Sequence, residues 1–163
     1  MKFKRSLPFL VTSLFVAMFS TAVMAQTTLR FGHANSPGEI AHDLYKEFAD
    51  NVTKKSGGQL VVRVFPSEQL GKEVDLLQQL KSGALDISSP SMPTLNSMVP
   101  AFEMPSAPFL WRDWKEAEAV IRGPAMEPIW TELKDKHNIV PLSKIWYWGW
   151  RNFTFSNKEV RKP

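Results

Sequence analysis

The stretch VRVFPSEQLGKEVDLLQQLKSGALDIS, residues 62–88, decides the fold class because it combines a strand, a helix and a second strand without a long connection. The first strand is rich in β-branched residues and stops at Pro66. The helix, over residues 71–83, places three apolar residues on one face: Val74, Leu77 and Leu80. ALDISS, residues 84–89, follows as a short strand. This unit predicts two parallel strands joined by a right-handed crossover.

The preceding segment predicts a further strand and helix. TTLRFGHA (27–34) alternates apolar and polar residues, which is typical of a strand. In residues 36–58, Ser36 is expected to cap a helix, with Pro37 in its first turn and Glu39 completing a capping box. The expected buried stripe of this helix is Ile40, Leu44, Phe48 and Val52. The chain therefore predicts an α/β fold with a parallel sheet.

The rest of the chain is expected to be mainly helical. A proline-rich stretch, 89–109, predicts a long loop that holds a short helix near residues 94–99. Two more helices are expected over 113–123 and 124–138, and a strand over 139–150.

The N-terminus predicts export. Residues 1–25 begin with three basic residues, continue through a short apolar run and end on small residues, which is typical of a cleaved signal peptide. Without this segment the chain has 17 basic and 16 acidic residues. A nearly neutral chain without a basic patch argues against a nucleic-acid partner, and we expect no stable membrane insertion after cleavage. These features predict a periplasmic protein.

Sequence signatures of catalysis are absent. The chain has no cysteine, no serine-nucleophile elbow, no zinc-protease motif and no phosphate-binding glycine loop. The spacing of His33, His42 and His137 does not predict a metal site, and we expect Glu39 and His42 to lie on a solvated helix face. We therefore expect a protein without cofactor or metal that is not an enzyme.

The stretch IWYWGWRNFTFSN (145–157) offers a candidate anion contact. In an extended chain, Tyr147, Gly149 and Arg151 share one face, and the glycine leaves space between a phenol and a guanidinium. A guanidinium can bind a carboxylate through two parallel hydrogen bonds, which suits a small organic acid. Alternatively, this is a core strand whose arginine pairs with a nearby acid.

With these residues identified, the chain resembles the solute-binding proteins of tripartite ATP-independent periplasmic (TRAP) transporters. The motifs that carry the resemblance are LRFGHANSPG (29–38), the opening stretch 62–88, PFLWRD (108–113) and GWRNFTFSNKEVRKP (149–163). The resemblance implies a periplasmic-binding-protein-like (type II) fold, in which two α/β domains close on an organic acid. It also implies delivery of that acid to a membrane permease.

The resemblance further implies site residues and domain boundaries. Arg151 matches the family's cleft arginine, Ala34, Asn35 and Ser91 match positions of ligand contacts in the family, and Glu73 is a weaker candidate. The expected divisions are a signal peptide (1–25), most of the first domain (26–148) and the start of the second (149–163). The chain would then be an N-terminal fragment, with the family's second arginine beyond Pro163. A periplasmic sensor for a membrane signalling protein, or less readily an exported enzyme, remains an alternative.

Overall fold

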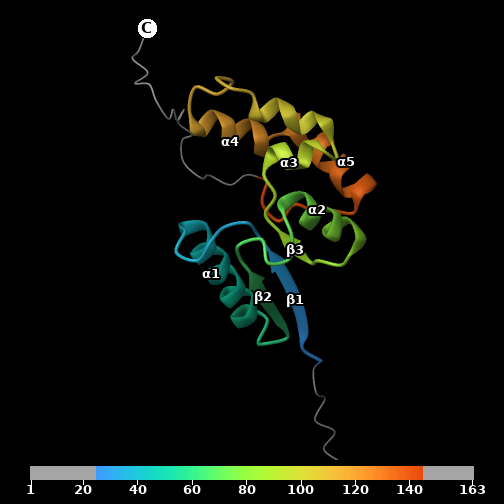
Figure 1. Cartoon of the computed structure of the whole chain (residues 1–163). Helices are drawn as coiled ribbons and strands as arrows, with labels where there is room; N and C mark the ends of the chain where they lie inside the picture. Colours follow the sequence, from blue (N-terminus) through green and yellow to red (C-terminus); the bar gives the residue numbers. More distant parts are fainter. Residues whose placement is uncertain (1–24, 145–163) are drawn as a thin grey trace, which may run out of the picture.

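Three parallel strands form one sheet in the order β2-β1-β3 (Figure 1). The structure is a computed structural model that describes residues 25–144. The strands are β1 (Thr27–Gly32), β2 (Leu60–Phe65) and β3 (Ile87–Ser88). In the central strand, Phe31 pairs with Val64 on one side and with Ile87 on the other. The predicted parallel sheet is confirmed, although β3 is shorter than expected.

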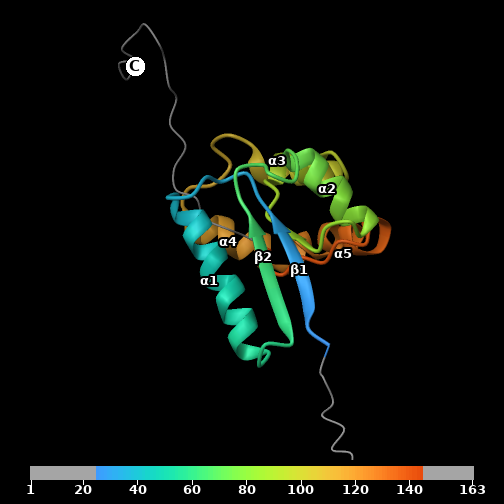
Figure 2. The same ribbon diagram turned by 60° about the horizontal axis from the view of Figure 1, so that its bottom comes forward.

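Helix α1 (Ile40–Lys55) packs on one face of the sheet (Figure 2). The side chains that it buries against Phe31 and Val62 are Ala41, Tyr45 and Ala49. Most of the predicted stripe was therefore wrong in phase by about one residue, since Ile40 is 80% exposed and Leu44 and Phe48 are also exposed; Val52 is partly buried against this core as predicted. The small alanines and the Tyr45 ring fit close to the sheet, and the bulkier aliphatic residues lie at the edge of the contact.

The predicted start of α1 at Ser36 was also wrong, because the helix begins at Ile40 with Glu39 at its N-cap position. Gly38 has φ +92°, which is a left-handed conformation that interrupts a right-handed helix. Half of the expected capping box is present, since the Ser36 backbone N–H donates to the Glu39 carboxylate at 2.8 Å. The residues thus form a tight turn before the helix.

Helix α2 (Glu73–Ser82) covers the opposite face of the sheet, where Gly32 allows a close approach. A Cβ atom at Gly32 would lie 2.9 Å from a methyl carbon of Leu76. Leu76 and Leu77 are fully buried, but Val74, which was predicted to be buried, is 53% exposed. Helices on both faces of a parallel sheet are the arrangement that alternating strands and helices produce.

The chain after β3 forms a helical layer with its own core. Its elements are α3 (Met92–Asn96), η1 (Pro100–Ser106), α4 (Trp114–Arg122), η2 (Pro124–Met126) and α5 (Glu127–His137). The rings of Phe102 and Trp130 meet edge to face with centroids 4.7 Å apart, and the Trp130 indole donates to the Ile121 carbonyl at 3.1 Å. Leu77 of α2 belongs to this core and links it to the sheet. The predicted helices are confirmed.

Residues 139–144 have no regular secondary structure, so the strand predicted over 139–150 is wrong as far as Lys144, and the remainder lies outside the described residues.

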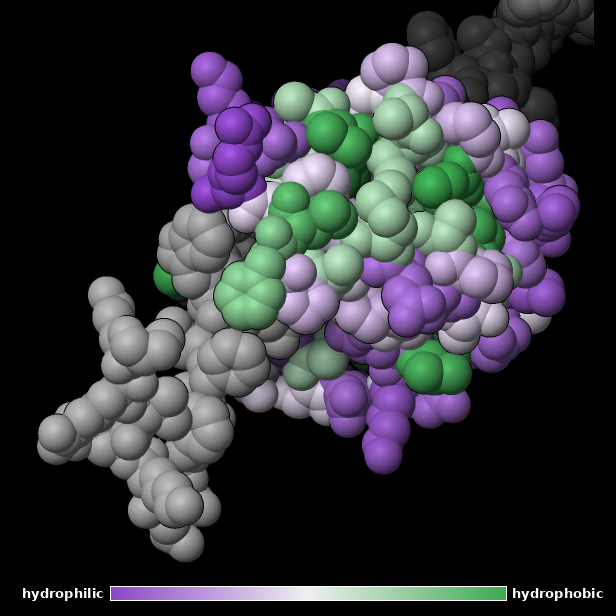
Figure 3. Space-filling model, turned by 90° about the horizontal axis from the view of Figure 1, so that it is seen from above, coloured by the Kyte–Doolittle hydropathy of each residue, from purple (hydrophilic) through white to green (hydrophobic). Residues whose placement is uncertain are grey.

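Apolar side chains remain at the surface, and Phe109 is 93% exposed. Figure 3 shows apolar side chains gathered on the face seen from above, with polar side chains at the border. Within residues 25–144, no helix is long and apolar enough to cross a membrane.

Candidate functional site

The carboxyl ends of the three strands meet at one edge of the sheet. Gly32 pairs with Phe65 of β2 and with Ser88 of β3, so the loops that follow emerge side by side. The Ser88 hydroxyl donates to the Gly32 carbonyl at 2.9 Å and ties two of the strand ends together. Ligands of open α/β sheets bind at this kind of edge.

The loop after β1 is hydrogen-bonded to the loop after β2 and to the residue that precedes α1. The Ser67 backbone N–H donates to the Asn35 carbonyl at 2.9 Å, which anchors this loop to the one after β2. On its other side, the Asn35 amide donates to the Glu39 carboxylate at 2.7 Å. This bond, followed by that from the Ser36 backbone, lowers the pKa of Glu39. The amide of Asn35 is therefore held in a defined orientation by an ionised partner.

The loop after β3 is anchored by Glu73, the first residue of α2. Glu73 Oε2 accepts three hydrogen bonds: from the Ser91 backbone N–H (3.2 Å), the Ser91 hydroxyl (2.8 Å) and the Thr94 hydroxyl (2.6 Å). Glu73, Ser91 and Thr94 are all half-buried. One carboxylate oxygen thus fixes the start of α3 against the start of α2.

Tyr45 connects the two anchored loops. Its ring lies against His33, at the end of β1, with centroids 4.7 Å apart. Burial raises the pKa of the Tyr45 phenol, a hydrogen bond with the Ser89 side chain acts in the opposite direction, and the charge of Glu73 raises the pKa further. Tyr45 thus contacts His33 through its ring, while Ser89 after β3 and Glu73 at the start of α2 act on its phenol.

A pair of histidines lies directly beneath the loop after β1. His33 is 1% exposed and His42 is 8% exposed, so the prediction that His42 lies on a solvated helix face was wrong. His42 Nδ1 lies 3.4 Å from His33 Nε2. The pKa of His33 is lowered to about 4, mainly because burial disfavours the charged ring and also because His42 is adjacent, while Glu39 acts in the opposite direction.

Four of the predicted site residues lie in segments at this edge: Ala34 and Asn35 after β1, Ser91 after β3, and Glu73 at the start of α2. Ala34, Asn35, Glu73 and Ser91 are half-buried, and the last two are directly hydrogen-bonded. The other three candidates, Tyr147, Gly149 and Arg151, lie outside the described residues.

Sequence reasoning missed Thr94 and the two buried histidines as parts of this edge. The spacing of Ser91 and Thr94 around the start of a short helix was a usable signal for Thr94, since hydroxyl groups at such positions bind nearby acceptors. No sequence pattern pairs a residue at a strand end with one inside the next helix, so the histidine contact required the tertiary structure.

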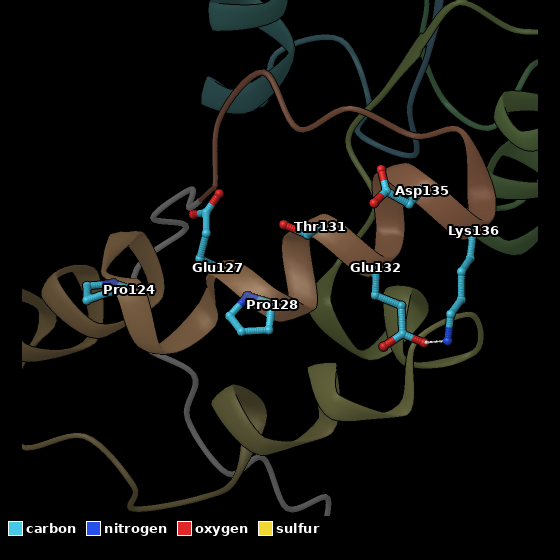
Figure 4. Close-up of a pocket in the computed structure, with 7 residues that line it drawn as sticks. All are labelled: Pro124, Glu127, Pro128, Thr131, Glu132, Asp135 and Lys136. Atoms are coloured by element: carbon cyan, nitrogen blue, oxygen red, sulfur yellow. Dashed lines mark hydrogen bonds and ion pairs between the residues drawn. The ribbon is translucent and has the colours of Figure 1, made fainter.

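A surface hollow away from this edge lies along α5 (Figure 4). Two of its three acidic side chains are already paired: Glu132 with Lys136 at 2.8 Å, and Glu127 with Lys144. No group of three metal-binding side chains occurs within the described part of the chain. The groove therefore carries no chemistry that competes with the edge of the sheet as the candidate site.

Residues 31–163 match the family described as bacterial extracellular solute-binding proteins, family 7. The chain belongs to this family. The predicted resemblance to TRAP solute-binding proteins is thereby confirmed, and the family consists of solute-binding proteins rather than enzymes.

A curated relative of this family 7 chain is the 2,3-diketo-L-gulonate-binding periplasmic protein YiaO of Escherichia coli, with 28% identity over 150 residues. The match covers 91% of this chain and 44% of the relative, so the chain spans less than half the length of YiaO.

Solved structures of TRAP-type binding proteins share the fold. The sugar acid-binding protein DctPAm of Advenella mimigardefordensis, in complex with galactonate, has a TM-score of 0.65 and 28% identity over 69% of this chain and 36% of its own. A TRAP periplasmic solute-binding protein of Sulfurospirillum deleyianum with bound succinate has a TM-score of 0.64 and 28% identity over the same shares. These similarities confirm the predicted type II binding-protein fold for the part that the chain covers.

Proposed function

We propose that this chain is the N-terminal part of a periplasmic TRAP solute-binding subunit, which captures a small organic acid and delivers it to a membrane permease. The observation that carries the proposal is the match to the solute-binding family over residues 31–163, together with a half-buried polar edge where such folds bind ligands. The relatives named above bind compounds that share an acid group, which supports a carboxylate as the common feature.

The charges at the edge suggest how the ligand is oriented. Glu73 is a hydrogen-bond acceptor whose Oε2 already receives three donors, so a ligand carboxylate placed beside it would meet like charge. The ligand carboxylate is therefore assigned to Arg151, whose guanidinium can bind it with two parallel hydrogen bonds. The uncharged end of the ligand, with any hydroxyl groups, would face Glu73 and Ser91, and Asn35 would border the site.

Calorimetry with galactonate and succinate tests the assignment of Arg151. We expect Arg151→Ala to weaken binding at least thirtyfold, because removing one member of a desolvated charge pair costs about 2–5 kcal/mol. Arg151→Lys is the matched control: it retains the charge but loses the two-pronged geometry, so it should give an intermediate affinity. Unchanged affinity in Arg151→Ala, in a folded variant, would exclude this residue as the carboxylate contact.

Export and delivery need separate measurements. N-terminal sequencing of the periplasmic protein should begin at Gln26, whereas a retained leader would contradict the expected cleavage after Ala25. If a second domain starts at residue 149, as the family resemblance implies, the reading frame should continue beyond Pro163 into that domain. Permease genes beside this reading frame would support transport, and a membrane kinase gene would favour the sensor alternative.

A further inference from the structure

The contact between His33 and His42 joins the two ends of the loop that carries Asn35, one at the end of β1 and the other in the first turn of α1. His33 directly follows the central strand; its backbone N–H donates to the Phe65 carbonyl (3.1 Å), and its carbonyl accepts from the Glu68 N–H (3.2 Å). His42 lies in the first turns of α1 and reaches back to His33 Nε2. The upper end of the same loop is closed by the bond between Asn35 and Glu39. The histidine pair thus links the strand end to the helix start between which Asn35 is held.

We infer that the His33–His42 pair positions the Asn35 side of the candidate site and releases it when the medium becomes acidic. One ring must donate N–H to the ring nitrogen of the other, which two neutral imidazoles can do and two charged ones cannot. His33 Nδ1 is also buried with no hydrogen-bond partner in the described part of the chain. A protonated His33 would therefore bury a charged donor without an acceptor.

The groups around the pair do not remove this sensitivity. Glu39, from the turn before α1, favours a charged His33, but its carboxylate is exposed and already bound to Asn35. Tyr45 of α1 packs its ring on His33, and Glu73 of α2 acts on Tyr45. The balance of these effects favours the neutral ring, since burial and His42 outweigh Glu39 and lower the pKa of His33 to about 4.

The direction of the pH effect follows from proton linkage. An exposed histidine is protonated near its ordinary pKa of 6.5, whereas the pKa of His33 in the closed loop is about 4. Between these pH values the opened loop binds a proton that the closed loop does not, so acid favours opening. A difference of this size changes the equilibrium between closed and opened loop by at most about 300-fold. Above pH 6.5 His33 is neutral in both states, so the pH no longer favours the opened loop.

The test uses NMR on the exported chain without its leader, because it needs no ligand. The imidazole Cε1–H signal of His33 should titrate below pH 5, and the Asn35 amide signals should shift over the same range. The variant His33→Gln/His42→Asn keeps amide groups at the two contact positions and should abolish the Asn35 shift. His137→Gln, at the end of α5, is the matched control and should leave it unchanged. Titration of His33 near pH 6.5, or an Asn35 shift that persists in the double variant, would overturn the inference.

The inference rests on the proposed function only for its effect on capture, and the two can fail separately. Galactonate and succinate should bind more weakly at pH 4.5 than at pH 7.5, and the double variant should lose most of this difference. If neither compound binds at pH 7.5, the carboxylate assignment is contradicted for these probes, while the NMR titration still decides the histidine pair. If binding is equally pH-dependent in the double variant, other groups control capture and the inference is wrong.

Discussion

Replacing Thr94 with valine should measure how strongly Glu73 holds the loop after β3. The substitution keeps the shape of the side chain but removes the hydroxyl that donates to Glu73 Oε2 at 2.6 Å. A hydrogen bond to a charged group contributes about 1.5–3 kcal/mol. Both residues are half-buried, and Ser91 still provides two donors to the same oxygen, so we expect a value near the lower limit, about 1.5 kcal/mol.

Chemical denaturation of the variant and of a double-mutant cycle with Glu73→Gln provides the assay. The free energies of unfolding should give a coupling energy of about 1 kcal/mol between Thr94 and Glu73. Thr131→Val on the exposed surface of α5 is the matched control and should change stability by less than about 0.5 kcal/mol. A coupling energy within about 0.3 kcal/mol of zero would refute the view that this carboxylate anchors α3.

Three further substitutions test the packing of the helical layer. Gly123→Ala should destabilise the protein by about 1–3 kcal/mol in urea unfolding, because the added Cβ would lie 2.6 Å from the Ala119 carbonyl oxygen; a neutral result would contradict this crowding. Phe102→Ala should cost about 3–5 kcal/mol, since the ring is fully buried against Trp130, and a loss below about 1 kcal/mol would be incompatible with that burial. Phe109→Gly should stabilise the protein by up to about 1 kcal/mol, because the exposed Phe109 has φ +61°; a lower melting temperature would show that its ring contributes contacts.

The sequence predicted the order of the elements because their signals are local. Pro66 ends a strand, Gly83 ends α2 in a left-handed conformation with φ +76°, and Asn138 ends α5 with φ +57°. Proline restricts its own backbone, whereas glycine and asparagine tolerate the left-handed conformation, and neither effect needs a distant partner. The family motifs predicted the family correctly for the same reason, since they combine turn, cap and strand residues in a fixed order.

The family resemblance assigned site residues to segments that follow the strands, and parallel strands direct their carboxyl ends to the same side of a sheet. Only the tertiary structure decided which side of α1 faces the sheet. A helix with several apolar residues can pack in more than one rotation, and Tyr45 with its neighbouring alanines fits more closely than the stripe of Ile40 and Leu44. The same rotation buries His42 against His33. This contact joins two different elements, so no local sequence pattern could predict it.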